Sequence, residues 1–275
     1  MQVIILGSGS PLPDPLRAGP STLVRTSAGD FLFDCGRGVL MRAAGAGSGA
    51  GALKAVLLTH LHSDHITDLN DVYTMRWAMS FQPNPLPIYG PAGTAALVSA
   101  MEAMLEPDIG YRLAHHDDLQ WRPSAEVTEV ERGLIFEEGQ VRITSAPTDH
   151  APVRPTVGYR IDDGGQSVVI AGDTVPCAGL DELSQDAGVL VQTVVRRDLI
   201  EQFGLPRLSD VLDYHSSVAD AAQTAARNRV GTLVLTHLVP TPVPGTEGEW
   251  LDQAKAHFGG NIELATDLLT VEAGG

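Results

Sequence analysis

Four side chains that can bind a metal lie within six residues, His60-Leu-His62-Ser-Asp64-His65, one residue after the apolar run at residues 55–58. A short, continuous apolar run predicts a buried strand. His60 and His62 are two residues apart, so in an extended segment they point to the same side. Asp64 and His65 follow where the chain turns towards a helix. One such peptide can therefore offer two ligands to one metal ion and two to an adjacent one.

Three further metal-binding residues follow other predicted strands. His150 comes after the strand expected at residues 141–145, Asp173 follows the strand at 167–171, and His237 follows the strand at 232–235. Taken singly, these residues have ordinary interpretations as strand-end histidines or a helix-capping aspartate. Ligand sites in layered α/β folds collect at the carboxyl ends of strands, which favours one shared centre.

These seven residues predict a dinuclear metal centre. We assign His60, His62 and His150 to one metal, Asp64, His65 and His237 to the other, and Asp173 to a bridge between them. Imidazole and carboxylate ligands without a thiolate favour Zn²⁺, so we expect two Zn²⁺ per chain, with Mn²⁺ or Fe²⁺ as alternatives. Two metals roughly 3.5–4 Å apart share a water that ionises near neutral pH, and the bridging hydroxide attacks an ester.

Two more residues are candidates around this centre. His215 precedes two serines that can cap a helix, so it lies beside a positive helix end, where it could protonate a leaving group or contact an oxyanion. The alternative for His215 is a structural cap. Asp34 either orients a ligand or is a plain turn residue. Asp64 and His215 are the predicted catalytic residues.

The order of elements predicts an α/β fold. Strands and helices alternate, with helices expected at residues 66–80 and 94–105, and no break in composition divides residues 1–275, so we expect a single domain. Residues 57–61 and 234–238 are nearly the same peptide, and both end a buried strand with Thr-His. This echo suggests two similar halves packed sheet to sheet, each delivering a histidine.

Composition restricts the functional class. The chain of 275 residues has a net charge of −16, which excludes a generic basic nucleic-acid binder. Residues 1–60 hold five basic and three acidic residues, so the remainder carries −18. The two cysteines form no disulfide framework, and we expect neither a signal peptide nor a membrane span. These features predict a cytoplasmic protein without a membrane partner.

The motifs resemble the metallo-β-lactamase superfamily, and more narrowly its ribonuclease Z branch, among the short relatives that lack an arm. The broad resemblance rests on the seven residues above, and the narrower one on residues 6–11, 33–36, 214–217 and 235–237. It implies an αβ/βα sandwich of two mixed β-sheets flanked by helices, a dinuclear zinc site and a homodimer.

Two departures from that branch concern the substrate. In ribonuclease Z, an arm that clamps tRNA is inserted in the chain before the strand that leads to Gly-Asp-Thr. In this chain we expect residues 158–172 to form a hairpin that is too short to contain such an arm. Relatives also have a glutamate that orients the catalytic histidine, whereas this chain reads Val-Gln-Thr-Val at residues 191–194. With the acidic charge, both departures argue against efficient trimming of precursor tRNA.

The sequence therefore predicts a phosphodiesterase of the ribonuclease Z kind that acts on small molecules or short, unstructured nucleic acids. An arylsulfatase-type hydrolase, whose relatives also lack an arm, and a lactonase are the alternatives. A non-catalytic binding protein of the same fold is disfavoured, because decayed relatives lose ligands and all seven positions are filled here.

Overall fold

The computed structural model describes residues 1–274, in which fourteen strands form two seven-stranded sheets. The first sheet has the order β14 (Leu269–Glu272), β1 (Gln2–Gly7), β2 (Ser21–Thr26), β3 (Gly29–Phe33), β4 (Leu53–Leu57), β5 (Leu86–Gly90) and β6 (Ala125–Glu129). The second has the order β13 (Asn261–Leu264), β12 (Thr232–Val239), β11 (Val189–Val195), β10 (Gln166–Ile170), β9 (Val157–Asp163), β8 (Val141–Pro147) and β7 (Gly133–Glu138).

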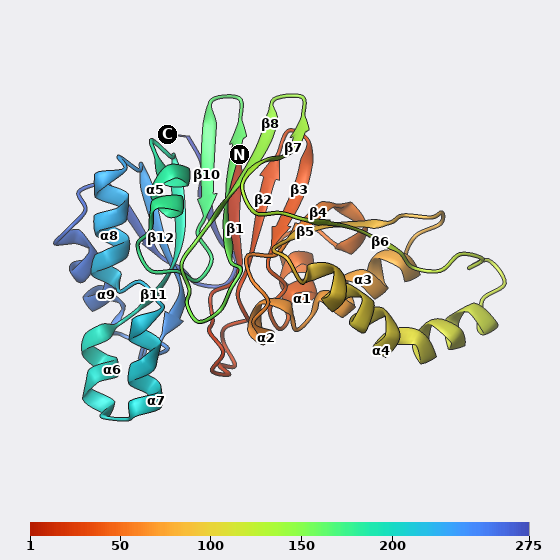
Figure 1. Ribbon diagram of the computed structural model, residues 1–275, viewed down its shortest axis with the longest axis horizontal. Helices are drawn as coiled ribbons and strands as arrows, with labels where there is room; N and C mark the ends of the chain where they lie inside the picture. Colours follow the sequence, from red (N-terminus) through yellow and green to blue (C-terminus); the bar gives the residue numbers. More distant parts are fainter. Residues whose placement is uncertain (275) are drawn as a thin grey trace.

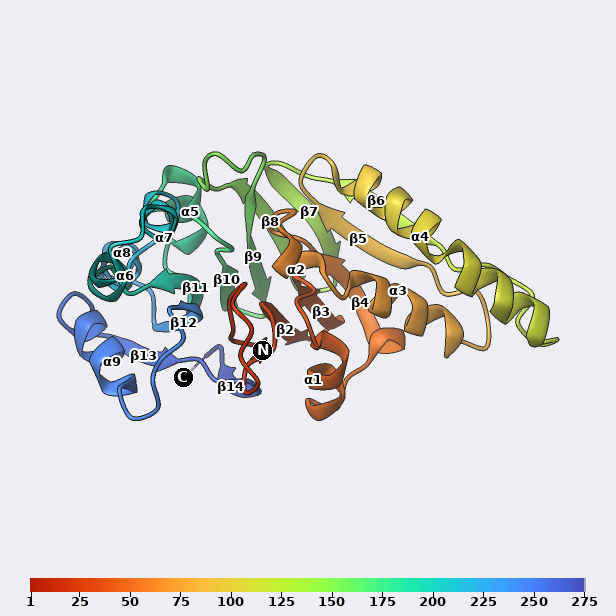
Figure 2. The ribbon, with the colours of Figure 1, turned by 90° about the horizontal axis from the view of Figure 1, so that it is seen from below.

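Helices cover the outer faces of both sheets (Figures 1 and 2). The first sheet carries α1 (Val39–Gly45), α2 (Ser63–Ile66), α3 (Leu69–Ala78) and α4 (Thr94–His115), with the short 3₁₀ helix η1 (Ala50–Ala52). The second carries α5 (Ala178–Ser184), α6 (Arg197–Phe203), α7 (Pro206–Ser209), η2 (Asp210–Asp213), α8 (Val218–Arg227) and α9 (Glu247–Lys255). The predicted αβ/βα sandwich of two mixed sheets is confirmed.

The core lies between the sheets and beneath the helices. Strand β11 shows how one sequence serves both layers, because successive side chains of a strand point to opposite faces. Val189 and Val191 pack into the cluster between the sheets, whereas Leu190 and Val194 pack into the cluster under α5, α8 and α9. All seven residues of β11 are buried, and its sequence is apolar except at Gln192 and Thr193, as expected for a strand that is covered on both faces.

The similar peptides at residues 57–61 and 234–238 lie at the ends of two strands, β4 and β12, that have different positions in their sheets. Strand β4 pairs in parallel with β3, the last strand of an antiparallel meander. Strand β12 pairs with β11, which in turn pairs with β10, the last strand of its own meander. Each half thus delivers a histidine, as predicted, but from a different strand position.

The helix predicted for residues 66–80 is wrong in one respect, because the structure divides the segment into α2 and α3. A continuous helix would need the His65 carbonyl as an acceptor for the backbone N–H four residues later. Here the Cys35 N–H donates a hydrogen bond to the His65 carbonyl at 2.7 Å. The Gly38 N–H donates to the Asp68 carboxylate at 2.6 Å. The turn after β3 therefore interrupts the helix beside the histidine-rich loop.

The helix predicted for residues 94–105 is too short. Helix α4 runs for 22 residues through Pro107, and Ile109, beyond the proline, is buried against Trp77 and Leu119. This packing offsets the hydrogen bond that proline removes. Among residues 1–274, none of the helices combines the length and hydrophobicity needed to cross a membrane. Strands β9 and β10 join directly across residues 164–165, so the arm-less hairpin expected at 158–172 is confirmed.

Candidate metal centre

The structure brings the seven predicted ligands together at the carboxyl ends of strands from both sheets. His60 and His62 follow β4, Asp64 and His65 lie in α2, His150 follows β8, Asp173 follows β10, and His237 lies near the end of β12. All are buried except His62, which is half-buried. Residues from both sheets therefore form one polar cluster at the edge of the sandwich.

One group of nitrogens surrounds His62. Its Nδ1 lies 3.0 Å from His60 Nε2 and 3.4 Å from His150 Nε2. Asp173 Oδ2 lies 3.9 Å from each of those two Nε2 atoms. Ligands of a tetrahedral zinc ion at about 2.0–2.1 Å from the metal are about 3.3 Å apart. The group thus has the spacing of a metal site.

A second group shares the same carboxylate oxygen. Asp64 Oδ2 lies 3.2 Å from His237 Nε2 and 3.6 Å from His65 Nε2. Asp173 Oδ2 lies 3.4 Å from His65 Nε2 and 3.5 Å from His237 Nε2. Because Asp173 Oδ2 is close to nitrogens of both groups, it occupies the place that a bridging ligand would take. The two clusters are consistent with a dinuclear metal site.

Unpaired polar atoms test whether these residues fit a metal. His65 Nε2 and Asp173 Oδ1 are buried without a hydrogen-bond partner. Leaving such atoms unpaired is costly, and each needs an explanation. Both belong to side chains that we predicted as ligands, and both atoms are of the kinds that bind Zn²⁺. The donor set therefore fits divalent metal ions.

The charges of the cluster are divided between its histidines. Burial, with positive neighbours, holds the pKa of His60 well below its usual value, and burial lowers that of His150 to about 4. Burial also opposes the charging of His65 and His237, but nearby carboxylates together outweigh it and raise both pKa values: Asp173 with Asp34 for His65, and Asp173 with Asp64 for His237. Burial would raise the pKa of Asp173, but His237 and His65 hold it well below its usual value. The carboxylates thus create a demand for positive charge that bound metal ions would meet.

Asp34 holds one ligand from behind. Its Oδ2 lies 2.8 Å from His65 Nδ1 and accepts from the Thr59 hydroxyl at 2.8 Å, while Oδ1 accepts from the Thr59 N–H at 2.8 Å. Thr59 Oγ1 also lies 3.0 Å from His60 Nδ1. These contacts favour the orienting interpretation of Asp34 and add Thr59, which the sequence analysis did not identify. Its place directly before His60 was the available signal.

His215 lies beside the bridging carboxylate. Its Nε2 is 3.2 Å from Asp173 Oδ2, and its Nδ1 is 3.0 Å from the Val211 carbonyl oxygen. His215, Asp173 and His237 also form a group close enough to share a metal, so the geometry allows a ligand role as well as an acid role. Ser217 caps α8 in a capping box with Asp220, which supports the helix start predicted there.

Gly172 sets the backbone before Asp173. Its φ is +67°, and an added Cβ would lie 2.7 Å from the Thr59 Cβ. Only glycine fits such a close approach in the left-handed region without strain. Thr193 donates to the Gly172 carbonyl at 3.0 Å, so β11 supports the loop that carries Asp173.

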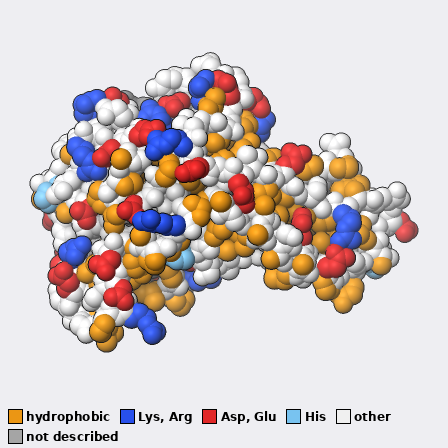
Figure 3. Space-filling model, viewed as in Figure 1, with side chains coloured by type: hydrophobic (Ala, Val, Ile, Leu, Met, Phe, Trp, Pro, Cys, Tyr) orange, Lys and Arg blue, Asp and Glu red, His pale blue; other side chains and the backbone are white. Residues whose placement is uncertain are grey.

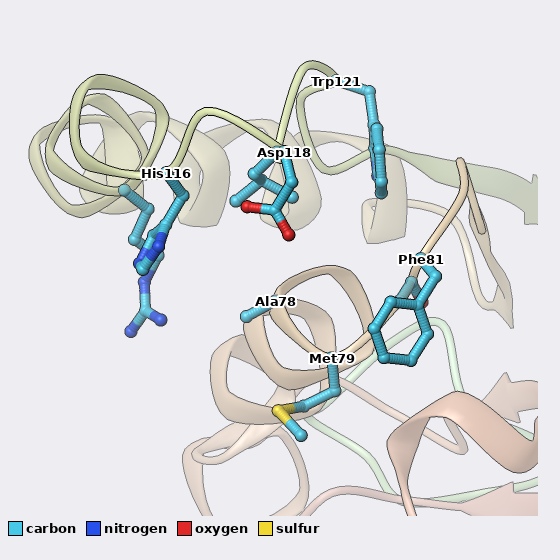
Figure 4. Close-up of a pocket in the computed structure, with 9 residues that line it drawn as sticks. Ala78, Met79, Phe81, His116, Asp118 and Trp121 are labelled. Carbon is cyan, nitrogen blue, oxygen red and sulfur yellow. The ribbon is translucent and has the colours of Figure 1, made fainter.

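A separate cavity lies away from these residues, between the end of α3 and the loop after α4 (Figure 4). Met79, Phe81, His116, Asp118 and Trp121 are among its lining residues, and none of the predicted ligands is. The histidine cluster, and not this cavity, is therefore the candidate catalytic site.

Comparison with known proteins agrees with this geometry. Residues 30–238 match the β-lactamase superfamily domain. The chain is 56% identical to the ribonuclease Z of Mycolicibacterium gilvum, over 99% of this chain and 96% of that protein. It is also 56% identical to the ribonuclease Z of Mycobacterium avium, over 99% and 98% of the two chains.

Solved structures show the same fold at lower identity. The metallo-β-lactamase fold protein YhfI from Bacillus subtilis superposes with a TM-score of 0.74 at 24% identity, covering 98% of both chains. The short form of human tRNase Z superposes with a TM-score of 0.73 at 22% identity, covering 100% of both chains. With the full-length sequence similarity, these findings show that the chain belongs to the ribonuclease Z family of the metallo-β-lactamase superfamily.

Proposed function

We propose that this chain is a two-metal phosphodiesterase that cleaves RNA, with precursor tRNA and small diesters as substrate classes. The observation that carries the proposal is the shared position of Asp173 Oδ2, within 3.9 Å of ring nitrogens from both histidine groups. The full-length relatives named ribonuclease Z support the choice of an RNA phosphodiester.

The predicted ligands fall into two groups, one for each metal. His60, His62 and His150 would hold one metal, and Asp64, His65 and His237 the other, with Asp173 between them. Two bound zinc ions would supply an ionised water near neutral pH and stabilise the charge that develops on the phosphate. Asp34 keeps the His65 ring turned so that Nε2 faces Asp173.

His215 would act at the leaving group. Its Nδ1 faces a carbonyl, which can only accept, so Nδ1 carries the proton in that contact and Nε2 faces the centre. In the charged form, Nε2 could give a proton to the departing ribose oxygen, as a general acid does. A ribose alkoxide is a poor leaving group, so this step matters most for RNA.

The missing arm does not separate this chain from its relatives. The proteins named ribonuclease Z align over 96–98% of their own length, so they too leave little room for a long insertion. On the face shown in Figure 3, Lys and Arg are scattered among Asp and Glu rather than gathered in a stripe. The preference for small or unstructured diesters over precursor tRNA therefore stays a prediction, as do the homodimer, the two Zn²⁺ ions and the cytoplasmic location.

One panel of substrates tests the proposal. Metal-loaded protein should hydrolyse bis-p-nitrophenyl phosphate and a single-stranded oligoribonucleotide, and should cleave precursor tRNA more slowly. A chelator should abolish these activities. Hydrolysis of p-nitrophenyl sulfate or of a homoserine lactone, with neither phosphodiester cleaved, would replace the proposal with the sulfatase or lactonase alternative.

A further inference from the structure

Two histidines of the centre are held by the backbone of one short segment. The carbonyl oxygen of Val211 lies 3.0 Å from His215 Nδ1, and that of Tyr214 lies 2.8 Å from His150 Nδ1. A carbonyl oxygen can only accept a hydrogen bond, so both rings carry the proton on Nδ1. Their Nε2 atoms are thereby left to face the centre. We name residues 210–214 the carbonyl segment.

Two other buried histidines of the centre are held differently. His65 Nδ1 contacts the Asp34 carboxylate at 2.8 Å, and His60 Nδ1 contacts the Thr59 hydroxyl at 3.0 Å. Those partners are side chains of residues that follow β3 and β4. His150 and His215 depend instead on how the carbonyl segment is folded, because main-chain carbonyls move only with the backbone.

Packing fixes the carbonyl segment in two ways. The Tyr214 ring lies against both histidines, with centroids 5.1 Å from His150 and 4.8 Å from His215. Leu212 is 8% exposed and belongs to a small cluster with Val195, Ile200 and Val239. This cluster joins the segment to β11, β12 and α6, at the base of the helical excursion that α6 and α7 form (Figure 1).

We propose that the carbonyl segment is a positioning element for the metal centre, and that Leu212 is the residue through which the fold holds it. It sets the ring orientation and the proton-bearing nitrogen of His150 and His215 together. Its effect on metal binding acts through His150, and its effect on leaving-group departure acts through His215. The second effect rests on the proposed function; the first does not.

The test variant is Leu212→Ala, with Leu119→Ala as its control. Leu119 is 9% exposed and also belongs to a small satellite cluster, but it packs against Trp77 and Ile109 and lines a cavity that contains none of the predicted metal ligands. Both changes remove the same side chain at nearly the same burial. A difference between them therefore reports position rather than general loss of packing.

Zinc affinity, measured by competition with a chromogenic chelator, should fall about tenfold or more in Leu212→Ala, the range for a lost partner of a metal-binding histidine. At saturating zinc, kcat for a single-stranded oligoribonucleotide should fall by about 10- to 100-fold, because a small misplacement of an acid is costly. At the same zinc concentration, kcat for bis-p-nitrophenyl phosphate should change by less than about threefold, because nitrophenolate leaves with little need of a proton.

The outcomes are distinguishable. The inference is overturned if Leu212→Ala matches Leu119→Ala in zinc affinity, or if both substrates slow in parallel at saturating zinc. Wild-type protein that cleaves neither substrate refutes the proposed function, and the zinc comparison then decides the inference alone. If Leu212→Ala does not fold, Leu208→Ala, which removes a partly buried neighbour of the same cluster, should show both effects at smaller size. Wild-type behaviour of that variant would count against the inference.

Discussion

Replacing Asp34 by asparagine should weaken metal binding although Asp34 is not itself a predicted ligand. The residue is 5% exposed, and its two oxygens accept from the Thr59 N–H, the Thr59 hydroxyl and His65 Nδ1. Its φ is +59°, a left-handed conformation that asparagine tolerates better than most residues. The substitution therefore changes the hydrogen bonding with little backbone strain.

The size of the effect follows from the contacts. In one orientation of the asparagine side chain its NH₂ group faces the Thr59 N–H, and in the other it faces the proton on His65 Nδ1. In both orientations two hydrogen-bond donors face each other. The His65 ring can escape only by moving its proton to Nε2, the atom that faces Asp173. Losing one hydrogen bond to a charged group costs about 1.5–3 kcal/mol. At about 1.4 kcal/mol per factor of ten, zinc affinity should fall roughly 10- to 100-fold.

A chelator competition on Asp34→Asn and wild type measures this directly. Asp68→Asn is the matched control, because the Asp68 carboxylate accepts from the Gly38 N–H at 2.6 Å, which an amide oxygen can also do. The control should keep wild-type zinc affinity. Equal affinity in Asp34→Asn and wild type, or an equal loss in both variants, would refute the reasoning.

Three further predictions concern the centre. Asp173→Ala should lose both zinc affinity and activity, because both groups share its Oδ2; elemental analysis that finds two metals in an active variant would contradict the bridge. His215→Ala should lower kcat for RNA by roughly 10²–10⁴-fold with metal content unchanged, whereas loss of a metal would make His215 a ligand. Gly172→Ala should lower the free energy of unfolding by about 2 kcal/mol or more, read as a lower Tm, because the new Cβ meets Thr59 at 2.7 Å in a left-handed backbone.

The sequence predicted most of the site because ligand side chains have a residue signature. Histidine and aspartate at strand ends are visible in a single chain, and the αβ/βα sandwich places such ends at one edge. The same logic found Asp34. The alternation of elements, with the resemblance it supports, was enough to predict two mixed sheets flanked by helices.

Partners without a residue signature could not be predicted. The carbonyls of Val211 and Tyr214 belong to the backbone, so any residue there could supply them. The break between α2 and α3 depends on a turn that approaches from residues 35–38, far along the chain. The residues of the edge strands β6 and β7 are exposed or half-buried, and the longest apolar run in either strand is residues 134–136, which is shorter than the run that predicts a strand.

The central claim is that two metals in this histidine cluster catalyse phosphodiester hydrolysis. Zinc titration into metal-free protein, with bis-p-nitrophenyl phosphate hydrolysis followed at each addition, tests it most directly. We predict that activity rises to a break at two equivalents of zinc per chain. Full activity at one equivalent would contradict the dinuclear centre, and no hydrolysis at any ratio would contradict the phosphodiesterase.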